Sequence, residues 1–175
     1  MSAASSDRPP REWRSGVKTR DKLFYIYTSG TTGNPKAANF SHLRFLSVGG
    51  AYTEIAGVRP DDRVYCVLPL YHTAGGVIAV SMAMLNGATL VLRRKFSASE
   101  FWRDCHAHGV TIFQYIGELC RYLLNRPEGP EDHTHVVRCA VGNGLRPDIW
   151  AKFQHRFGIR DVREFYGATE GNFAL

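Results

Sequence analysis

Short β-type runs alternate about five times with helix-type segments along this chain, and this alternation is the feature that most limits its fold. The connections between the runs are short, and a helix is the usual crossover between parallel strands. The pattern therefore predicts an α/β fold with a largely parallel sheet over residues 22–175. Residues 1–21 are predicted to be a disordered leader or linker, because their prolines and interspersed charges cannot form an apolar face.

The expected elements follow from residue spacing, caps and turn residues. Strands are predicted at 23–27, 37–40, the second half of 61–68, 88–92, 110–115, 136–141 and 161–165. Helices are predicted at 42–55, 75–85, 98–108, 118–125 and 147–157, and a surface loop at 126–132. Ser41 and Ser97 are the expected N-caps, and Gly57 and Gly158 the expected stops. Loops that follow the strands should then converge at one edge of the sheet, where ligands bind in such folds.

Composition excludes several classes of protein. The chain has 175 residues, 44% of them hydrophobic, and no run of about eighteen apolar residues that would suggest a membrane span. The N-terminus lacks the apolar core of a secretory signal, so an intracellular location, cytoplasmic or membrane-associated, is expected. Its four cysteines are scattered without a Cys-x-x-Cys pair, which argues against a disulfide framework or a structural zinc site and predicts buried thiols.

The net charge of +6 is divided between the leader and the rest of the chain. Residues 1–22 hold six basic and three acidic residues, so the leader contributes +3 and the remainder +3. That remainder suits an anionic nucleotide or a weak contact with a membrane surface. No nucleic acid partner is expected, because the basic residues are not interleaved with aromatic stacking positions.

A loop rich in glycine and hydroxyl groups at 25–36 is the first candidate site. Glycines let the backbone turn tightly and bring N–H groups to a ligand, while hydroxyls and a lysine add donors and a positive charge. These features predict a polyphosphate grip made of Thr28, Ser29, Gly30, Thr31, Thr32, Gly33 and Lys36. The spacing differs from a Walker A loop, because Pro35-Lys36-Ala37 replaces Gly-Lys-Ser/Thr. A polar loop joining two strands is the alternative interpretation.

The segment Tyr166-Gly-Ala-Thr-Glu170 after the last predicted strand is the second candidate. Here Tyr166 offers a ring on which adenine can stack, Gly167 a turn, Thr169 a donor to phosphate and Glu170 a carboxylate for Mg²⁺. Alone, the segment also fits an exposed turn at a strand end. Together with the phosphate grip it favours a magnesium nucleotide, because a triphosphate needs a hard cation between its oxygens.

Two more strand ends carry candidate residues. Gly142, Asn143 and Gly144 form an expected turn at which a flat ligand edge can approach the backbone, although a lone Gly-x-Gly is a weak signal. His72 follows the strand within 61–68. Its imidazole either orients a carboxylate or caps the next helix, and the sequence leaves both interpretations open.

The two principal motifs together resemble the AMP-binding signature of the adenylate-forming superfamily. That superfamily includes acyl-CoA synthetases, luciferases and peptide-synthetase adenylation domains. The intervening segments at 68–72, 95–102, 114–123 and 141–147 are similar to those of fatty acid transport proteins, also called very-long-chain acyl-CoA synthetases. The resemblance covers residues 22–175, and Asn34 departs from it because the family usually carries leucine there.

The resemblance implies a two-step ligase reaction. A fatty carboxylate attacks the α-phosphate of ATP to give acyl-AMP and pyrophosphate, and coenzyme A thiolate then displaces AMP. The implied partners are ATP, Mg²⁺, coenzyme A and a long-chain or very-long-chain fatty acid. Lipid substrates also imply peripheral membrane association, coupled in the family to fatty acid uptake.

The resemblance also implies roles for individual residues. Thr28 and Glu170 would hold Mg²⁺, residues 29–36 would bind the β- and γ-phosphates, and Thr169 would contact the α-phosphate. Tyr166 and the turn at 142–145 would form the adenine slot. His72 would stand at the mouth of an acyl channel lined by 115–117 and the helix at 74–85. The residues expected to take part in catalysis are Thr28, Lys36, His72 and Glu170.

In the family, an acidic ribose-binding residue and a small domain with the adenylation lysine lie downstream of the second motif. The sequence therefore predicts a partial AMP-binding domain at 22–175, without the lysine-bearing domain. The unpaired sheet edges expected of such a piece would favour association. Two functions follow as alternatives: part of a fatty acyl-CoA ligase, or a non-catalytic nucleotide- or acyl-binding fragment.

Overall fold

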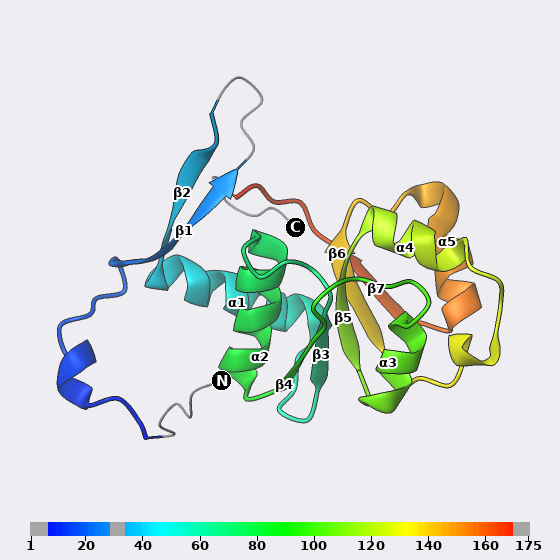
Figure 1. Cartoon of the computed structure of the whole chain (residues 1–175), viewed down its shortest axis with the longest axis horizontal. Coiled ribbons are helices and arrows are strands. Elements are labelled where there is room, and N and C mark those ends of the chain that lie inside the picture. The colour runs from blue at the N-terminus through cyan, green and yellow to red at the C-terminus, as the bar shows by residue number, and fades with distance from the viewer. Residues whose placement is uncertain (1–6, 29–33, 170–175) are drawn as a thin grey trace.

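The chain folds into a five-stranded parallel sheet with helices on both faces and a two-stranded antiparallel hairpin beside it (Figure 1). The computed structural model describes residues 7–28 and 34–169. The strand order of the large sheet is β4-β3-β5-β6-β7, and neighbouring strands are parallel throughout. This confirms the predicted α/β fold with a largely parallel sheet.

The strands are short, and those of the large sheet contain four or five residues each. They are β1 (Lys22–Thr28), β2 (Lys36–Ser41), β3 (Arg63–Cys66), β4 (Thr89–Leu92), β5 (Ile112–Ile116), β6 (Cys139–Asn143) and β7 (Asp161–Glu164). Val64 lies opposite Ile112, and Ile112 lies opposite Cys139. The three central strands are therefore held in one register.

The helices form two layers (Figure 1). One face of the sheet carries α1 (His42–Ala56), the π-helix η2 (Thr73–Ala79) and α2 (Val80–Asn86), and the other carries α3 (Phe101–Ala107), α4 (Gly117–Leu124) and α5 (Pro147–Phe157). Alternate strand residues supply the two cores: Val64 and Ile112 pack on the first layer, while Tyr65 and Phe113 pack on the second. Each helical layer therefore buries the apolar residues on its own face of the sheet, so the sheet is covered on both sides.

Local capping explains most of the helix boundaries. The Ser41 hydroxyl accepts from the Arg44 N–H at 3.2 Å, and Gly57 ends α1 with φ 55°. Pro147 is the first residue of α5, and Gly158 ends it with φ 61°. These four predicted boundaries are confirmed. Ser41 accepts from a backbone N–H of the first turn, Pro147 occupies a position where an N–H would have no helical partner, and both glycines adopt the left-handed conformation typical of a helix end.

The predicted Ser97 cap is wrong. The Ser97 carbonyl accepts from the Glu100 N–H at 3.3 Å, and its hydroxyl pairs with that of Ser99 at 2.9 Å. The Ser97 carbonyl and hydroxyl are therefore both engaged in a turn that precedes the helix, and α3 starts only at Phe101. The predicted strand at 136–141 likewise begins later, at Cys139, and includes Gly142 and Asn143, which were expected in a turn.

The predicted helix at 75–85 is two helices of different kinds. It begins at Thr73 as a π-helix and becomes α-helical at Val80. A Cβ atom at Gly76 would lie 1.9 Å from the Leu70 carbonyl oxygen, so the first turn packs directly on the preceding backbone. The predicted surface loop at 126–132 also departs from expectation, because it contains the 3₁₀-helix η3 (Pro130–Asp132) with Asp132 buried.

The hairpin β1–β2 is separate from the parallel sheet. Thr28 lies opposite Lys36, and neither strand pairs with the five-stranded sheet. The prediction that the loop after Tyr27 follows a strand of the parallel sheet is therefore wrong, because β1 belongs to the separate hairpin. Within the leader, residues 7–21 are exposed and contain the 3₁₀-helix η1 (Arg11–Arg14); disorder there stays a prediction.

The four cysteines are buried, and burial keeps their thiols protonated. All four cysteines are free and buried as predicted, and burial raises the pKa of each thiol, that of Cys139 to about 11.

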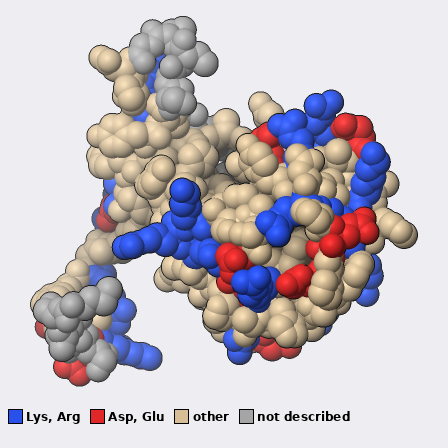
Figure 2. Space-filling model, turned by 45° about the vertical axis from the view of Figure 1, so that its right-hand side comes forward, with Lys and Arg blue, Asp and Glu red and all other residues tan. Residues whose placement is uncertain are grey.

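Figure 2 shows acidic and basic side chains interspersed over the right-hand part of the molecule, so this face presents no continuous positive surface there among the described residues. In the described part of the chain, no helix is long and apolar enough to cross a membrane.

His135 is expected to make the fold less stable as the pH falls. Its ring stacks on Trp102 at a centroid distance of 4.4 Å, and burial lowers the pKa of the imidazole. As the pH falls, the unfolded state therefore takes up a proton on His135 at a higher pH than the folded state does. Stability is fully present above the ordinary pKa of about 6.5 and is lost as the pH falls toward the lowered value. Urea unfolding near pH 8 and near pH 5.5 should show a larger loss for the wild type than for His135→Phe.

The control for this measurement is His155→Phe, a change at an exposed position near the end of α5. Its loss of stability with falling pH should match that of the wild type. Equal pH dependence in the wild type and in His135→Phe would contradict the assignment to His135.

Candidate functional site

The strand order leaves an opening at the carboxyl edge of the sheet, between β3 and β5. The chain leaves β3 toward η2 on one face, whereas it leaves β5 toward α4 on the other. Neighbouring strands whose connections depart to opposite faces leave an opening at their carboxyl ends, and ligands bind there in sheets of this type. The loop that contains His72 follows β3, and Gly117 follows β5. The topology therefore places several predicted segments around one opening.

A small cavity of about 60 Å³ lies at this edge. His72, Asn143, Gly167 and Thr169 line it together with Thr73. These residues come from three segments that the sequence predicted would converge. The volume is too small for a nucleotide but has room for about one phosphate or carboxylate group.

Two threonine hydroxyls meet at the cavity. The Oγ1 atoms of Thr73 and Thr169 are 3.0 Å apart, and Thr73 is buried. Arg44 fixes the same segment, because its Nη2 donates to the Thr169 carbonyl at 2.7 Å. Its Nη1 donates to the Asn39 carbonyl of β2 at 3.4 Å, and its guanidinium lies over the Phe40 ring. Arg44 therefore joins the hairpin to the segment that contains Thr169. This contact holds the hairpin next to the cavity, although neither of its strands pairs with the parallel sheet.

His72 fits both interpretations that the sequence left open. It is the N-cap of η2, and its Nδ1 accepts from the Ala74 N–H at 3.4 Å. Because Nδ1 accepts, a neutral imidazole carries its proton on Nε2. His72 also lines the cavity, so Nε2–H is the group with which it can donate to a ligand oxygen.

The turn at Gly144 is fixed from the side by Glu164. The Glu164 carboxylate accepts from the Leu145 N–H at 2.7 Å, from the Gly144 N–H at 3.2 Å and from the Tyr115 hydroxyl at 2.8 Å. Burial, and then the hydrogen bond to Glu164, raise the pKa of Tyr115, so this hydroxyl remains a donor. One carboxylate of β7 thus joins the end of β5 to the turn after β6.

Glycine is required at two positions around this turn. A Cβ atom at Gly142 would lie 2.3 Å from the Tyr115 carbonyl oxygen, and one at Gly117 would lie 1.7 Å from the Gly144 carbonyl oxygen. Gly144 itself has φ 80°, a conformation that other residues rarely adopt. The backbone at the end of β5 and at the turn after β6 therefore packs without intervening side chains.

The structure describes only some of the remaining predicted site residues. Thr28 donates to the Lys36 carbonyl at 3.4 Å across the end of the hairpin, and Lys36 is exposed. Tyr166 follows β7 with 75% of its surface exposed. Ser29, Gly30, Thr31, Thr32, Gly33 and Glu170 lie outside the described residues. Among residues 7–28 and 34–169, no cluster of three His, Cys, Asp or Glu side chains could hold a metal ion.

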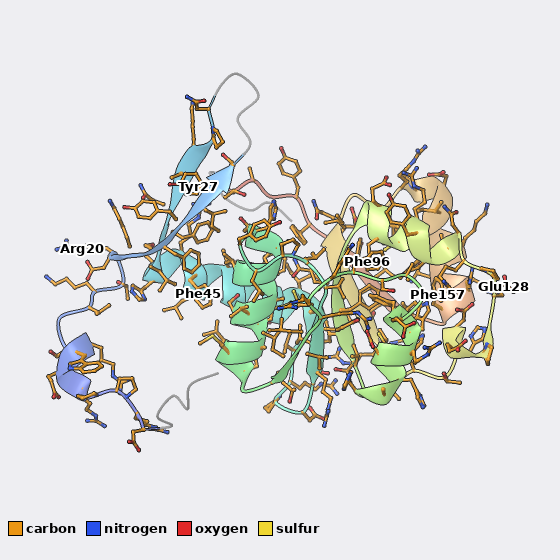
Figure 3. All side chains as sticks on the ribbon, viewed as in Figure 1. Arg20, Tyr27, Phe45, Phe96, Glu128 and Phe157 are labelled. Atoms are coloured by element: carbon orange, nitrogen blue, oxygen red, sulfur yellow. The ribbon has the colours of Figure 1, made fainter. Side chains whose placement is uncertain are left out.

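An apolar groove of about 360 Å³ separates the hairpin from the loop before η2. It is lined by residues 24–27 of β1 together with Leu70, Tyr71 and Gly76. Figure 3 marks Tyr27 on the hairpin, and this side chain is 71% exposed. The hairpin is thus next to the segment that carries His72 as well as to Thr169.

Two residues that position the site were missed from sequence. Arg44 lies on α1 and Glu164 on β7, and both bind backbone groups of distant segments. Arg44 and Thr169 are separated by 125 residues. A charged residue on a helix or strand usually faces solvent, so spacing alone carries no signal for such contacts.

The fold and the site together define an α/β protein with a small polar cavity at the carboxyl edge of its parallel sheet. Comparison with known proteins is consistent with this class. The model of the family of AMP-binding enzymes matches residues 2–175. The chain therefore belongs to the AMP-binding enzyme family.

Two curated relatives are similar over almost the whole chain. Long-chain fatty acid transport protein 3 of Homo sapiens is 54% identical over 98% of this chain and 25% of the relative. Long-chain fatty acid transport protein 5 of Mus musculus is 51% identical over 100% of this chain and 25% of the relative. The chain thus spans about a quarter of the length of these proteins.

Solved structures agree on the fold. The inhibitor-bound N-terminal domain of FACL13 from Mycobacterium tuberculosis matches 96% of this chain and 41% of its own, with a TM-score of 0.83 and 27% identity. ATP-bound MatB from Rhodopseudomonas palustris matches 89% of this chain and 31% of its own, with a TM-score of 0.77 and 27% identity. The architecture is that of the N-terminal domains of adenylate-forming enzymes.

Proposed function

We propose that the chain forms the nucleotide- and acid-binding part of a long-chain or very-long-chain fatty acid–CoA ligase, which activates its substrate through acyl-AMP. The observation that carries the proposal is the cavity at which His72, Asn143 and the Thr73–Thr169 hydroxyl pair meet. The names of the relatives support a long-chain fatty acid as the substrate class. The ATP-bound neighbour supports ATP as the nucleotide.

The described residues fit the reacting groups of such a ligase. The cavity has room for a single phosphate or carboxylate, and its lining residues His72, Thr169 and Asn143 can offer hydrogen-bond donors. In the proposal the carboxylate oxygen of the acid bonds to the α-phosphorus while the bond from that phosphorus to pyrophosphate breaks. His72 Nε2–H orients the carboxylate, and the Thr169 hydroxyl contacts the α-phosphate. Coenzyme A thiolate then displaces AMP and forms the thioester.

The nucleotide would extend from the cavity past the closely packed turn at 142–145. Tyr166, with its exposed ring, and the turn at 142–145 form the proposed adenine slot. Residues 29–33 and Lys36 would bind the β- and γ-phosphates, and Thr28 and Glu170 would hold Mg²⁺. When bound, Mg²⁺ neutralises charge on the phosphate oxygens. Peripheral attachment to a membrane, as expected for a lipid substrate, is part of the same proposal.

The alternative function is binding of nucleotide or acyl ligand without turnover. It needs only the donors that line the cavity, since binding alone involves no transfer step. The same site residues serve both functions. The difference lies only in whether acid-dependent pyrophosphate is released.

Replacing Thr169 with valine is expected to lower palmitate-dependent pyrophosphate release at least tenfold, because the α-phosphate loses a hydroxyl donor. The measurement is pyrophosphate release with ATP, Mg²⁺ and palmitate, next to ATP binding by calorimetry. Thr134→Val, at an exposed position remote in the fold, is the matched control and should leave both unchanged. ATP binding without acid-dependent release would favour the alternative, and absence of both would contradict the proposal.

A further inference from the structure

Residues 7–22 form an exposed basic arm that belongs to neither of the two cores. All of these residues are exposed, and they include six basic and three acidic side chains. In the described part of the chain, the arginines of the basic arm and Lys18 make no ion pair. The basic arm therefore presents a net charge of about +3 to its surroundings, and this charge is available to an anionic partner.

Trp13 lies in the middle of the basic arm, in the 3₁₀-helix η1 between Arg11 and Arg14. Its side chain is 75% exposed, whereas tryptophan is on average highly buried. Val17 is exposed in the same segment. Tryptophan is enriched where proteins meet a membrane surface, and neighbouring basic side chains are attracted there to anionic headgroups. The basic arm combines both kinds of side chain.

Strand β1 continues the basic arm with a row of exposed apolar side chains. Leu23, Tyr25 and Tyr27 are two residues apart, so they share one face of the strand, while Ile26 on the other face is buried. Figure 3 marks Arg20 on the basic arm and Tyr27 on the hairpin. Exposed tyrosines therefore follow the basic residues directly along the chain.

Backbone hydrogen bonds fix the basic arm to the start of α1. The Thr19 carbonyl accepts from the Leu43 N–H at 2.7 Å, and the Asp21 carbonyl accepts from the His42 N–H at 3.1 Å. Both N–H groups belong to the first turn of α1, where the helix supplies them with no partner. Figure 1 shows the basic arm and the hairpin on the same side of the five-stranded sheet. The basic arm and the row on β1 are therefore held next to each other.

Charge favours a lipid bilayer over a second copy of the chain as the partner of this surface. A second copy would bring another basic arm of the same sign. A bilayer with anionic headgroups offers the opposite charge to the basic arm and an apolar layer to the aromatic rings. The apolar groove of about 360 Å³ is lined by residues 24–27 of the same hairpin, so the surface also borders the candidate site.

We propose that residues 8–27 form a docking surface for a lipid bilayer that contains anionic headgroups. The arginine and lysine side chains of the basic arm bind lipid phosphates, and Trp13, Tyr25 and Tyr27 lie at the level of the headgroups. The inference rests on the proposed function for the lipid nature of the substrate, and it deepens that function by naming the surface that faces the bilayer.

The test measures binding of the 175-residue chain to vesicles of equal parts phosphatidylserine and phosphatidylcholine, next to vesicles of phosphatidylcholine alone. Binding is expected to the anionic vesicles and should weaken as salt is added. Tryptophan emission should shift to the blue on binding, because the Trp13 ring leaves water. The shift should be absent in Trp13→Ser, since Trp102 is buried and Trp150 is half-buried before any lipid binds.

A charge variant tests the role of the basic arm. It combines three changes: Arg11→Gln, Arg14→Gln and Lys18→Gln. Its affinity for anionic vesicles should fall at least thirtyfold, because each basic residue near such a surface contributes about fivefold. The matched control removes the same charge at exposed positions on α5 and next to it: Arg146→Gln, Lys152→Gln and Arg160→Gln. This control should retain nearly all of the affinity.

Several outcomes would overturn the inference. They are an absence of binding to anionic vesicles at low salt, and an equal loss of affinity in the charge variant and its control. Binding to duplex DNA as tight as to the vesicles, without a blue shift, would assign the basic arm to nucleic acid. Dimerisation without lipid that Trp13→Ser abolishes would assign the surface to a second copy.

Calorimetry with ATP separates this inference from the proposed function. The charge variant should bind ATP like the wild type, because its three changed residues lie outside the candidate site. Failure of the wild type to bind ATP, with vesicle binding intact, would count against the proposed function alone. Intact ATP binding without vesicle binding would count against the docking surface alone.

Discussion

Gly117→Ala is expected to lower ATP affinity at least tenfold and to destabilise the fold by about 2 kcal/mol, the usual cost of overpacking. The new Cβ atom would lie 1.7 Å from the Gly144 carbonyl oxygen and 3.0 Å from the Leu145 nitrogen. The contact is with backbone, so no side chain can move aside. The turn at 142–145 must shift away from the end of β5, and the proposed adenine slot shifts with it. Urea unfolding and calorimetric titration with ATP measure the two effects.

Gly50→Ala is the matched control for this change. Gly50 is exposed within α1, and a Cβ atom there meets nothing within 4 Å. This substitution should stabilise the helix by roughly 0.5–1 kcal/mol and leave ATP affinity unchanged. Unaltered ATP affinity in Gly117→Ala would contradict the placement of the nucleotide beside the turn.

Asp62→Ala is expected to have the largest effect on stability, a loss of about 3 kcal/mol or more. Asp62 is 3% exposed and accepts from Arg138 Nη2 at 2.5 Å, from the Thr111 hydroxyl at 2.7 Å and from the Arg59 N–H at 2.7 Å. Arg138 also donates to the Gly57 carbonyl at the end of α1 at 2.7 Å. Removing the carboxylate leaves the guanidinium without its counter-ion where three strands and α1 meet. Urea unfolding at neutral pH measures the loss.

The exposed pair of Arg146 and Asp148 supplies the control, with side chains 66% and 62% exposed. Asp148→Ala should change stability by less than about 0.5 kcal/mol, because solvent screens exposed pairs. Similar losses in the two alanine variants would refute the special role of Asp62.

The same carboxylate adds an acid-dependent component to stability. Burial alone would raise the pKa of Asp62, but the hydrogen bonds from Arg138, Thr111 and the Arg59 backbone together lower it. Its contribution is therefore present above the ordinary pKa of about 3.9 and is lost as the pH falls through the lowered value. The loss attributed to His135 occurs at higher pH, so the two groups can be separated in one titration.

Much of the fold could be predicted because its signals are local. The alternation of strands and helices, the cap at Ser41 and the stops at Gly57 and Gly158 depend on residues within a few positions of one another. The convergence of His72, Asn143 and Thr169 also followed, since parallel strands present their carboxyl ends at one edge. The roles assigned to these residues remain predictions.

The remaining features depend on contacts that spacing does not encode. The hairpin reaches the site through Arg44 and the groove at residues 24–27, not through the parallel sheet. Glu164 acts on the backbone of Gly144 and Leu145, twenty and nineteen residues away. The π-helical start of η2 arises from the close approach of Gly75 and Gly76 to the backbone at 68–70. Each feature is set by tertiary packing.

The double contact of Arg44 makes the hairpin and the cavity thermodynamically linked. One guanidinium holds the Asn39 carbonyl of the hairpin and the Thr169 carbonyl beside the cavity. Anything that stabilises one orientation of β2 must also favour the matching position of Thr169, and by reciprocity a group bound next to Thr169 must favour that orientation of the hairpin. If a polyphosphate binds as proposed, occupancy at its two ends would then be cooperative, and Arg44 would carry part of the coupling free energy.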